Sequence, residues 1–463
     1  MQKNYELDNC FIRKLTDVYS DFDILDFCEL DDKKYPYLLE SSAKGNSLSR
    51  YSILFYKPRR VIEKKKEETN SPFIEEVDRH FTQNRLNQDM KKANLDLKLP
   101  FLGGWFIYLG YELVEEIEEK LKIPESPYKI PTAFLDRVSS AIIFDKVKNE
   151  LFFISDNSKK DIFEMLKDYE KIKQNRHNPI VEISRKITAS KIDSSATHHE
   201  GVKECIKYIF SGEIFQANLS RLWEFDLDKK TSNTEIYRKL RISNPSPFGG
   251  LVSMPEGTII SSSPERLVQV KDNKLQTRPI AGTRPRGFSG LTDVELSKEL
   301  IGSKKERAEH LMLVDLERND ISRVCKAGSV KVDEMMVIES YAHVHHIVSN
   351  ISGTILEDTT PGKIIKAVFP GGTITGCPKH RCIEILGSLE KIGRGPYTGS
   401  FGYLCHNGEL DLNILIRSMV RTEDKLFIRA GGGIVADSNP QKETLETEAK
   451  ANGMLRALEL VNK

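Results

Sequence analysis

The 463-residue sequence lacks the signatures of several large protein classes. Its seven cysteines are an odd number and none forms a CxxC pair, so neither a disulfide framework nor a cysteine-rich zinc site is indicated. There is no GxxxxGK[ST] loop, no strand followed by GxGxxG and no HExxH helix, which argues against nucleotide phosphate transfer and zinc catalysis. No internal repeat or low-complexity segment is evident.

An excess of charge of either sign is also missing. The 69 basic and 68 acidic residues leave a formal charge of +1, so we expect no nucleic acid partner and no attachment to a membrane surface. The N-terminal MQKNYELDNC has no apolar run of signal-peptide length, and no later segment reaches the length of a membrane span. A cytoplasmic location is therefore expected.

The chain is long enough for two domains or one large layered domain. Residues 1–195 look like a β-rich domain, with strand-like YSILFY and a hairpin pattern in SSAIIFDKVKNELFFIS. Residues 196–463, the expected catalytic domain, begin with a helix and continue with consecutive strand-like segments such as GTIISSS, LQTRPIAGT and LDLNILIRSM. This order predicts an α+β fold of mostly antiparallel sheets with helices on their outer faces.

Several helix starts are marked by capping residues. Ser303 with Glu306 forms a capping box, and Thr360-Pro361 and Cys377-Pro378 place a proline in a first turn. Asn439-Pro440 predicts a last helix reaching about residue 460. These starts fix where side chains on the following helices will point.

The last helix carries charge on a face that becomes apolar further along. Glu443, Glu446 and Lys450 share a stripe with Met454 and Ala457. Buried carboxylates need a cation or hydrogen-bond donors, so the glutamate pair is interpreted as ligands of a hard divalent cation. The alternative is an exposed helix with an ordinary Glu446–Lys450 pair one turn apart.

Other polar groups accompany this helix. A triple glycine follows the strand-like KLFIRA and can bring backbone N–H groups close to an anion. Glu309 lies on the helix that starts at Ser303, Arg417 ends a strand-like segment, and Gly282-Thr283 forms a turn. Together they suit a small oxygen-rich anion held by a magnesium ion, an arginine and backbone donors.

In this order the segments resemble the blocks of the chorismate-utilising enzymes, which include the first components of anthranilate synthase and aminodeoxychorismate synthase and the isochorismate and salicylate synthases. The resemblance covers about residues 200–458 through IFQANLS, SSSPERL, TRPIAGTRPRG, ERAEHLMLVDLERND, HVHHIVS, FPGGTITGCPK, YTGSFGYL, GGGIVADS and ETLETEAKA. YLLESS and LGGWFIYLGYEL extend it more loosely toward the N-terminus. It implies an anthranilate-synthase-like fold, with two large, mostly antiparallel sheets packed face to face.

The resemblance also implies roles for individual residues. It assigns Mg²⁺ to Glu309, Glu443 and Glu446, and acid–base roles to Glu265 and His346. The carboxylates of chorismate would contact a further set: Gly282, Thr283, Tyr397, Arg417, Gly431, Gly432, Gly433 and Lys450. Outside their blocks, Tyr397 and Arg417 would be an ordinary strand residue and a surface cation.

One position indicates the nucleophile. Isochorismate and salicylate synthases carry a lysine base where this chain has Gln216, and that lysine activates water. A glutamine cannot act as a base, so ammonia is the expected nucleophile. The chain has no GxCxG nucleophile elbow, so the ammonia would come from a separate glutamine amidotransferase subunit.

Two aminated products stay open. Asn218, the NPSPFGG block and the triple glycine resemble aminodeoxychorismate synthase and favour 4-amino-4-deoxychorismate, on the route to p-aminobenzoate and folate. Ala281, however, stands where some of those enzymes have a nucleophilic lysine. Anthranilate with pyruvate, on the tryptophan route, is the alternative.

YLLESS also resembles the tryptophan-sensing motif of anthranilate synthases. Ser41, with Pro247 and Phe248, is therefore a candidate pocket for L-tryptophan, and a purely structural pocket is the alternative. Two other functions compete with amination: a non-catalytic sensor of chorismate or tryptophan, and an isomerase that uses water.

Overall fold

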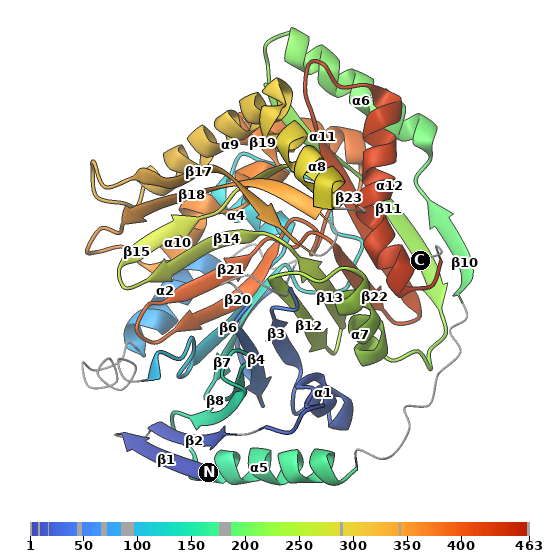
Figure 1. The fold of residues 1–463 in the computed structure, drawn as a ribbon. Helices are drawn as coiled ribbons and strands as arrows, with labels where there is room; N and C mark the ends of the chain where they lie inside the picture. Colours follow the sequence, from blue (N-terminus) through green and yellow to red (C-terminus); the bar gives the residue numbers. More distant parts are fainter. Residues whose placement is uncertain are drawn as a thin grey trace.

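The computed structural model describes residues 2–7, 10–16, 18–43, 49–65, 72–84, 97–175, 187–287, 290–341 and 344–460. Within them, two large sheets pack face to face and helices cover the outer surfaces (Figure 1). Neighbouring strands pair antiparallel throughout the registers of both sheets, for example where β3 pairs with β4. The predicted α+β fold is confirmed.

The first sheet runs through twelve strands, with a short thirteenth at its side. In spatial order these are β1 (Gln2–Leu7), β2 (Cys10–Thr16), β9 (Glu150–Ser155), β8 (Ser140–Asp145), β4 (Tyr51–Tyr56), β3 (Tyr37–Glu40), β12 (Phe248–Met254), β13 (Gly257–Ser263), β22 (Ser418–Thr422), β23 (Lys425–Ile434), β11 (Gln216–Leu227) and β10 (Ile187–Ile192), with β19 (Gly376–Cys377) beside β11.

The second sheet is built in the same way from ten strands of the described residues. Its order is β16 (Ile280–Pro285), β18 (Val344–Thr354), β15 (Lys274–Thr277), β14 (Arg266–Lys271), β21 (Leu410–Asn413), β20 (Ser400–Cys405), β6 (Gly104–Leu109), β7 (Ala133–Val138) and β5 (Arg59–Lys64), with β17 (Lys331–Ser340) on β18.

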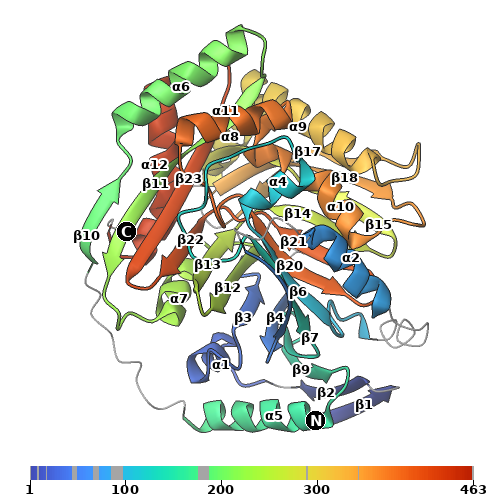
Figure 2. The same cartoon turned by 180° about the vertical axis from the view of Figure 1, so that it is seen from behind.

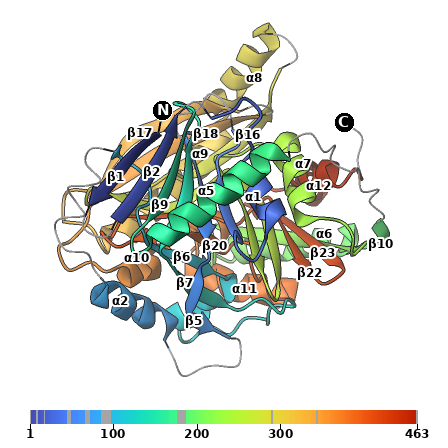
Figure 3. The same cartoon turned by 90° about the horizontal axis from the view of Figure 1, so that it is seen from below.

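The helices lie outside this pair of sheets, as the view from behind shows (Figure 2). Those on the first sheet are α1 (Leu25–Leu30), α5 (Lys159–Gln174), α6 (Ser195–Phe210), α7 (Asn233–Ser243), α11 (Lys379–Glu390) and α12 (Pro440–Ala457). Those near the second sheet are α2 (Phe73–Gln83), α4 (Val114–Ile117), α8 (Gly290–Gly302), α9 (Lys304–Ser322) and α10 (Pro361–Val368). Seen from below, α5 and α1 cross the lower end of the molecule and α8 projects from its edge (Figure 3).

One hydrophobic core lies between the two sheets. Phe55 and Ile143 of the first sheet meet Phe106 and Phe134 of the second, and all four are at most 4% exposed. The Phe55 and Phe106 rings pack edge to face with centroids 5.6 Å apart. Removing such a buried aromatic side chain costs about 3–5 kcal/mol of unfolding free energy, so this layer holds the sheets together.

Strands from both halves of the chain share each sheet. β3 pairs with β12 in the first sheet, and β6 pairs with β20 in the second. The expected domain boundary at residue 195 stays a prediction. Strands that precede residue 195 and strands that follow it are hydrogen-bonded to each other in both sheets. Residues that are distant in sequence are thereby brought to one end of the molecule.

Two neighbouring stretches pass from one sheet to the other. Residues 257–271 form β13 and then β14, and residues 410–422 form β21 and then β22. β13 pairs with β22 in the first sheet, and β14 pairs with β21 in the second. The segment LDLNILIRSM, expected as one strand, is therefore two strands in different sheets, and LQTRPIAGT is likewise divided between β15 and β16.

The predicted helix starts are confirmed. Asn439 accepts a hydrogen bond from the Lys442 N–H at 3.1 Å, and Ser303 accepts one from the Glu306 N–H at 3.3 Å. Thr360 caps α10 by accepting from the Lys363 N–H, and α11 follows Pro378. Within the described residues, none of the helices combines the length and the apolar character needed to cross a bilayer.

Candidate active site

Each of the two crossover points carries one of the predicted site residues. Glu265 lies between β13 and β14, and Arg417 lies just before β22. The Ile414 N–H donates to the Glu265 carbonyl oxygen at 3.0 Å, which ties one crossover to the other. Arg417 has a φ of +52°, a left-handed conformation that non-glycine residues rarely adopt and that concentrates at functional sites.

The triple glycine of β23 lies between two sets of polar side chains. A Cβ added at Gly432 would stand 3.5 Å from Glu443 Oε2 and from Glu446 Oε1. A Cβ at Gly431 would meet Asn218 Oδ1 at 2.7 Å and the Tyr397 hydroxyl at 2.8 Å. One glycine of the strand therefore borders the two carboxylates, and its neighbour borders an amide and a phenol.

The space available for a side chain differs between Gly432 and Gly433. A Cβ at Gly433 would approach Gln216 Nε2 to 2.2 Å, so a side chain there would displace the amide. At Gly432 the 3.5 Å distance to the glutamates is an ordinary contact, and alanine would fit. Glycine is required on the amide side more strictly than on the carboxylate side.

Two of the three predicted metal-binding glutamates are incompletely satisfied. Glu443 is 5% exposed, and its Oε2 and Glu309 Oε1 are buried without a hydrogen-bond partner in the described structure. Burial raises the pKa of Glu309 to about 7, with Glu306, Glu443 and Glu446 acting in the same direction against Lys305. Acidic oxygens in this state fit a hard cation such as Mg²⁺. Among the described residues, however, no three His, Cys, Asp or Glu side chains already form a closed metal-binding group.

Lys450 links this helix to the glycine strand. Its Nζ lies 2.7 Å from Glu446 Oε1 and donates to the Gly431 carbonyl oxygen at 2.9 Å. The Lys450 carbonyl oxygen accepts from Arg417 Nη1 at 3.1 Å. Half of the Glu446 side chain is exposed and the ordinary one-turn pair with Lys450 is formed, so a ligand role for Glu446 stays a prediction. Figure 1 shows α12 lying along β23.

Glu265 has the properties of a proton donor. Its side chain is 4% exposed, and burial raises its pKa to about 8, with a smaller contribution from the nearby Glu317. The Ile280 N–H contacts Glu265 Oε1 at 3.4 Å. A carboxylic acid with such a pKa is mostly protonated at neutral pH and can donate a proton to a leaving group.

His346, the second predicted acid–base residue, is held neutral by burial. Burial lowers the pKa of His346 to about 4, and the Arg417 charge adds to the effect. Its Nδ1 shares a 2.9 Å hydrogen bond with the Thr283 hydroxyl, and the two residues face each other in the β16–β18 register. The turn predicted at Gly282-Thr283 is wrong: both residues lie within β16, where Gly282 has a φ of +66° at an irregularity of the strand register, and Thr283 stands opposite the histidine.

The candidate tryptophan residues form a separate cavity. Ser41, Pro247 and Phe248 line a space of about 310 Å³ that is bordered by β3, β4 and β12 of the first sheet and by β20 and β21 of the second. The Ser41 hydroxyl is buried without a partner in the described structure. The structure thus brings these three residues together in one cavity. That cavity is separate from Glu309, Glu443 and Glu446.

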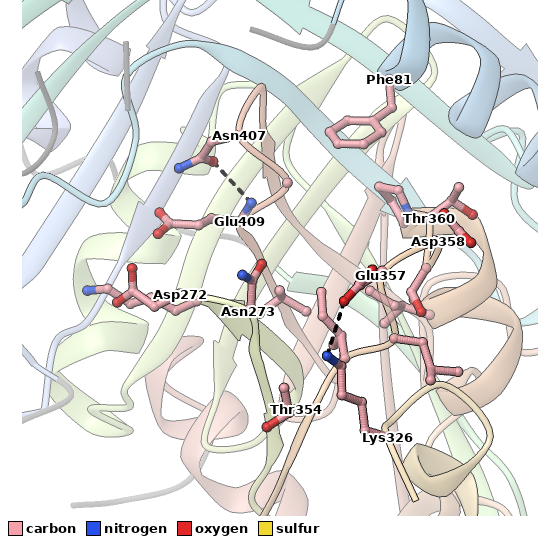
Figure 4. Close-up of a pocket in the computed structure, with 18 of the residues that line it drawn as sticks. Phe81, Asp272, Asn273, Lys326, Thr354, Glu357, Asp358, Thr360, Asn407 and Glu409 are labelled. Atoms are coloured by element: carbon pink, nitrogen blue, oxygen red, sulfur yellow. Dashed lines mark hydrogen bonds and ion pairs between the residues drawn. The ribbon is translucent and has the colours of Figure 1, made fainter. Parts of the chain in front are cut away.

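A larger cavity, of about 1060 Å³, lies elsewhere (Figure 4). It is bordered by the end of α2, the β14–β15 turn and the loops 354–360 and 407–409. Two of the charged residues that line it, Lys326 and Glu357, form an ion pair at 3.4 Å. No predicted site residue is among the described residues that line it, so it does not compete as the reactive centre.

Two charged residues near the site were not singled out from the sequence. Glu317 is buried on α9, accepts from the Thr277 hydroxyl at 2.8 Å, and raises the pKa of Glu265. Lys305 lies 3.8 Å from Glu309. Glu317 follows Leu313 by four positions, so extending the apolar stripe of this helix by one turn would have found it.

Comparisons with known proteins agree with this geometry. A family described as chorismate binding enzyme matches residues 34–456. Anthranilate synthase component 1 of Synechocystis sp. is 37% identical over 92% of this chain and 91% of its own length. Aminodeoxychorismate synthase component 1 of Bacillus subtilis is 39% identical over 78% of each chain.

A solved structure extends the similarity to the fold. Anthranilate synthase component I from Streptococcus pneumoniae TIGR4 has a TM-score of 0.77 and 30% sequence identity, covering 89% of this chain and 93% of its own. The two face-to-face sheets and the outer helices therefore follow an established architecture. The chain belongs to the family of chorismate-binding, chorismate-utilising enzymes.

Proposed function

We propose that this enzyme replaces the allylic hydroxyl of chorismate by ammonia, forming 4-amino-4-deoxychorismate. The proposal rests on Glu265, a buried acid whose pKa burial raises to about 8, together with Gln216, which stands where the resemblance gives the water-using enzymes a lysine base. An acid assists departure of a hydroxyl, and the lack of a base disfavours water as the nucleophile.

Substrate binding would use the cations and backbone donors of the crossover region. Arg417, Lys450 and the glycine strand suit the two carboxylates of chorismate, because a guanidinium, an ammonium and N–H groups all bind such anions. Glu309, Glu443 and Glu446 would hold the magnesium ion. When bound, that ion would offset the carboxylate charge and draw electron density from the ring.

The proton and bond changes balance within this site. The ammonia nitrogen forms a C–N bond, and the C–O bond of the hydroxyl breaks. The leaving hydroxyl takes the Glu265 proton and departs as water, and the new nitrogen loses one proton, which restores the acid. His346, held by Thr283, is neutral and can accept or donate a hydrogen bond during the transfer.

Anthranilate synthesis is the second candidate. It is favoured by the similarity over nearly the full length to an anthranilate synthase component, and by Ala281 in place of a nucleophilic lysine. Asn218, Pro247 and the triple glycine favour aminodeoxychorismate instead. Both reactions use the same acid, cation site and nucleophile, and they differ in whether pyruvate is lost.

The proposal includes a partner and a ligand. The word component in the names of the relatives supports a separate glutamine amidotransferase subunit that delivers ammonia. The cavity at Ser41 is proposed to bind L-tryptophan. A cytoplasmic location is supported by the seven free cysteines, none of which pairs with another.

Product analysis tests the function. The purified chain is incubated with chorismate, magnesium and isotopically labelled ammonium, with and without a lyase that releases p-aminobenzoate, and the products are identified by mass spectrometry. Labelled p-aminobenzoate formed only with the lyase is the expected result. Pyruvate released without the lyase would establish anthranilate synthesis, and unconsumed chorismate would refute amination.

A further inference from the structure

We propose that Gln216 and Asn218 together form the receiving site for ammonia; this inference rests on the proposed function. The two side chains occupy alternate positions of β11 and so project from the same face of the strand. They are 6% and 8% exposed, next to the glycine strand. Neither has a hydrogen-bond acceptor role in the fold that would explain its burial.

Both amides have an unused oxygen. Gln216 Oε1 and Asn218 Oδ1 are buried without a hydrogen-bond partner among the described residues. A buried acceptor without a hydrogen bond destabilises the fold, and an incoming donor removes that penalty. The amides can turn toward an incoming donor at little cost, because their terminal torsions are broad and no hydrogen bond to these oxygens is broken.

The backbone beneath these side chains is firmly held. The Asn218 N–H donates to the Thr375 carbonyl oxygen at 2.9 Å, and the Asn218 carbonyl oxygen accepts from Arg394 Nη2 at 2.7 Å. The Gln216 carbonyl oxygen lies 3.0 Å from Cys382 Sγ. A fixed backbone with two free amide oxygens is a positioned pair of acceptors, rather than a flexible polar surface.

This arrangement suits neutral ammonia. Ammonia has three N–H donors and one lone pair, so two carbonyl oxygens can hold two hydrogens and leave the lone pair free to attack carbon. Ammonium has no lone pair, and the nearby Lys450 and Arg417 charges disfavour a second cation. Water can also donate to the two oxygens, but neither amide can take its proton.

The glycine strand keeps the pair accessible. Any side chain at Gly431 would collide with Asn218 Oδ1, and any at Gly433 would collide with the Gln216 amide. The Tyr397 hydroxyl stands at the same distance from the Gly431 position as the Asn218 oxygen does, to within 0.1 Å (2.8 against 2.7 Å). Asn218 and Tyr397, a predicted chorismate contact, therefore border the same glycine.

The test separates binding of ammonia from binding of chorismate. The KM for ammonia and the KM for chorismate are measured with magnesium for the wild type, Asn218→Val, Asn218→Asp and Ser220→Ala. Ser220 is the matched control, since it projects from the same strand face but its hydroxyl already donates to Glu390 Oε1 at 2.6 Å. Circular dichroism confirms that each variant is folded.

In Asn218→Val, the KM for ammonia is expected to rise about tenfold, as the loss of one hydrogen bond would cause, while the KM for chorismate stays within about twofold. Asn218→Asp keeps an acceptor, but its charge attracts ammonium. The KM for total ammonia should therefore return toward the wild-type value, while kcat falls because ammonium has no lone pair. An unchanged KM for ammonia in Asn218→Val, or an equal rise in both constants, would overturn the receiving site alone. Absence of any chorismate consumption by the wild type would overturn the proposed function and this inference together.

Discussion

Two buried charge clusters of this enzyme differ in how completely they are satisfied. In the first, Glu390 is held by two hydrogen bonds from Arg394 at 2.8 and 2.9 Å and by the Ser220 hydroxyl, with Arg429 3.5 Å away. In the second, Glu265 and Glu443 are buried and Glu309 is partly buried, and Glu309 and Glu443 each have an oxygen without a partner in the described structure.

Their pKa shifts have opposite directions. The pKa of Glu390 is lowered: burial opposes this, but Arg394 and Arg429 outweigh it. Burial raises the pKa of Glu265 to about 8 and that of Glu309 to about 7. A satisfied cluster stabilises the fold by itself, whereas an unsatisfied one is stabilised when a proton, a cation or a substrate arrives. The first cluster is interpreted as structural and the second as functional.

The largest expected effect on activity is at Glu265. Glu265→Gln keeps the volume and removes the acid, so kcat should fall about 10²–10⁴-fold. The measurement is chorismate consumption with ammonium at constant free ammonia. Glu357→Gln, in the distant cavity, is the control and should keep wild-type rates. A Glu265→Gln variant with wild-type kcat would remove the proton donor from the mechanism.

The structural cluster should respond in stability instead. Arg394→Ala leaves Glu390 buried without its main partner, which should lower the free energy of unfolding by about 3–5 kcal/mol. Urea denaturation followed by circular dichroism measures this. If Arg394→Ala lost less stability than Glu265→Gln does, the contrast between the two clusters would be wrong.

Glu443 should affect activity without harming the fold. Glu443→Gln removes a charge that the fold leaves unpaired, so activity at fixed magnesium should fall about a hundredfold, as expected when a ligand that positions a metal is lost. The melting temperature should stay the same or rise. Magnesium titrations of activity provide the check, and an unchanged magnesium requirement would argue against Glu443 as a ligand.

The dependence of stability on pH sharpens the comparison further. Because the folded pKa of Glu265, about 8, lies above its ordinary value of 4.5, its contribution is fully present below that ordinary value and is lost as pH rises through about 8. The glutamine of Glu265→Gln does not ionise. The melting temperature of this variant should therefore rise relative to that of the wild type as pH increases from 4.5 to about 8. A difference that does not change with pH would contradict the raised pKa.

The smallest expected effect is at the Ser41 cavity. Ser41→Ala should leave amination unchanged without tryptophan, because the cavity is separate from the carboxylate set. With tryptophan present, any inhibition of the wild type should weaken in this variant. Inhibition curves measure the difference, and equal curves would leave the cavity a structural one.

Much of the local structure could be predicted from short-range chemistry. The caps at Asn439, Ser303 and Thr360 fixed the starts of three helices, and the resemblance named Glu265 and His346 as acid–base candidates. These features depend on residues within a few positions of one another. The buried side of α12 at Glu443 was also expected, and Leu445 on the opposite side is exposed as its position required.

Long-range arrangement was not predictable in the same way. The crossovers at Glu265 and Arg417 depend on which strands pair, and strand pairing is set by contacts between distant segments. The unpartnered oxygens of Gln216 and Asn218 depend on what surrounds them in space. Glu317 was missed because a glutamate on an apolar helix face looks like an error in the pattern until Thr277 is placed opposite it.

The most direct test of the contrast between the clusters is a thermal denaturation experiment with magnesium and chorismate on the wild type and Glu443→Gln. Ligands near 100 times their dissociation constant stabilise a folded protein by about 2.7 kcal/mol. The wild type should therefore melt several degrees higher with both ligands, while Glu443→Gln should gain little. Equal stabilisation of the two proteins would show that the Glu443 carboxylate does not bind the cation.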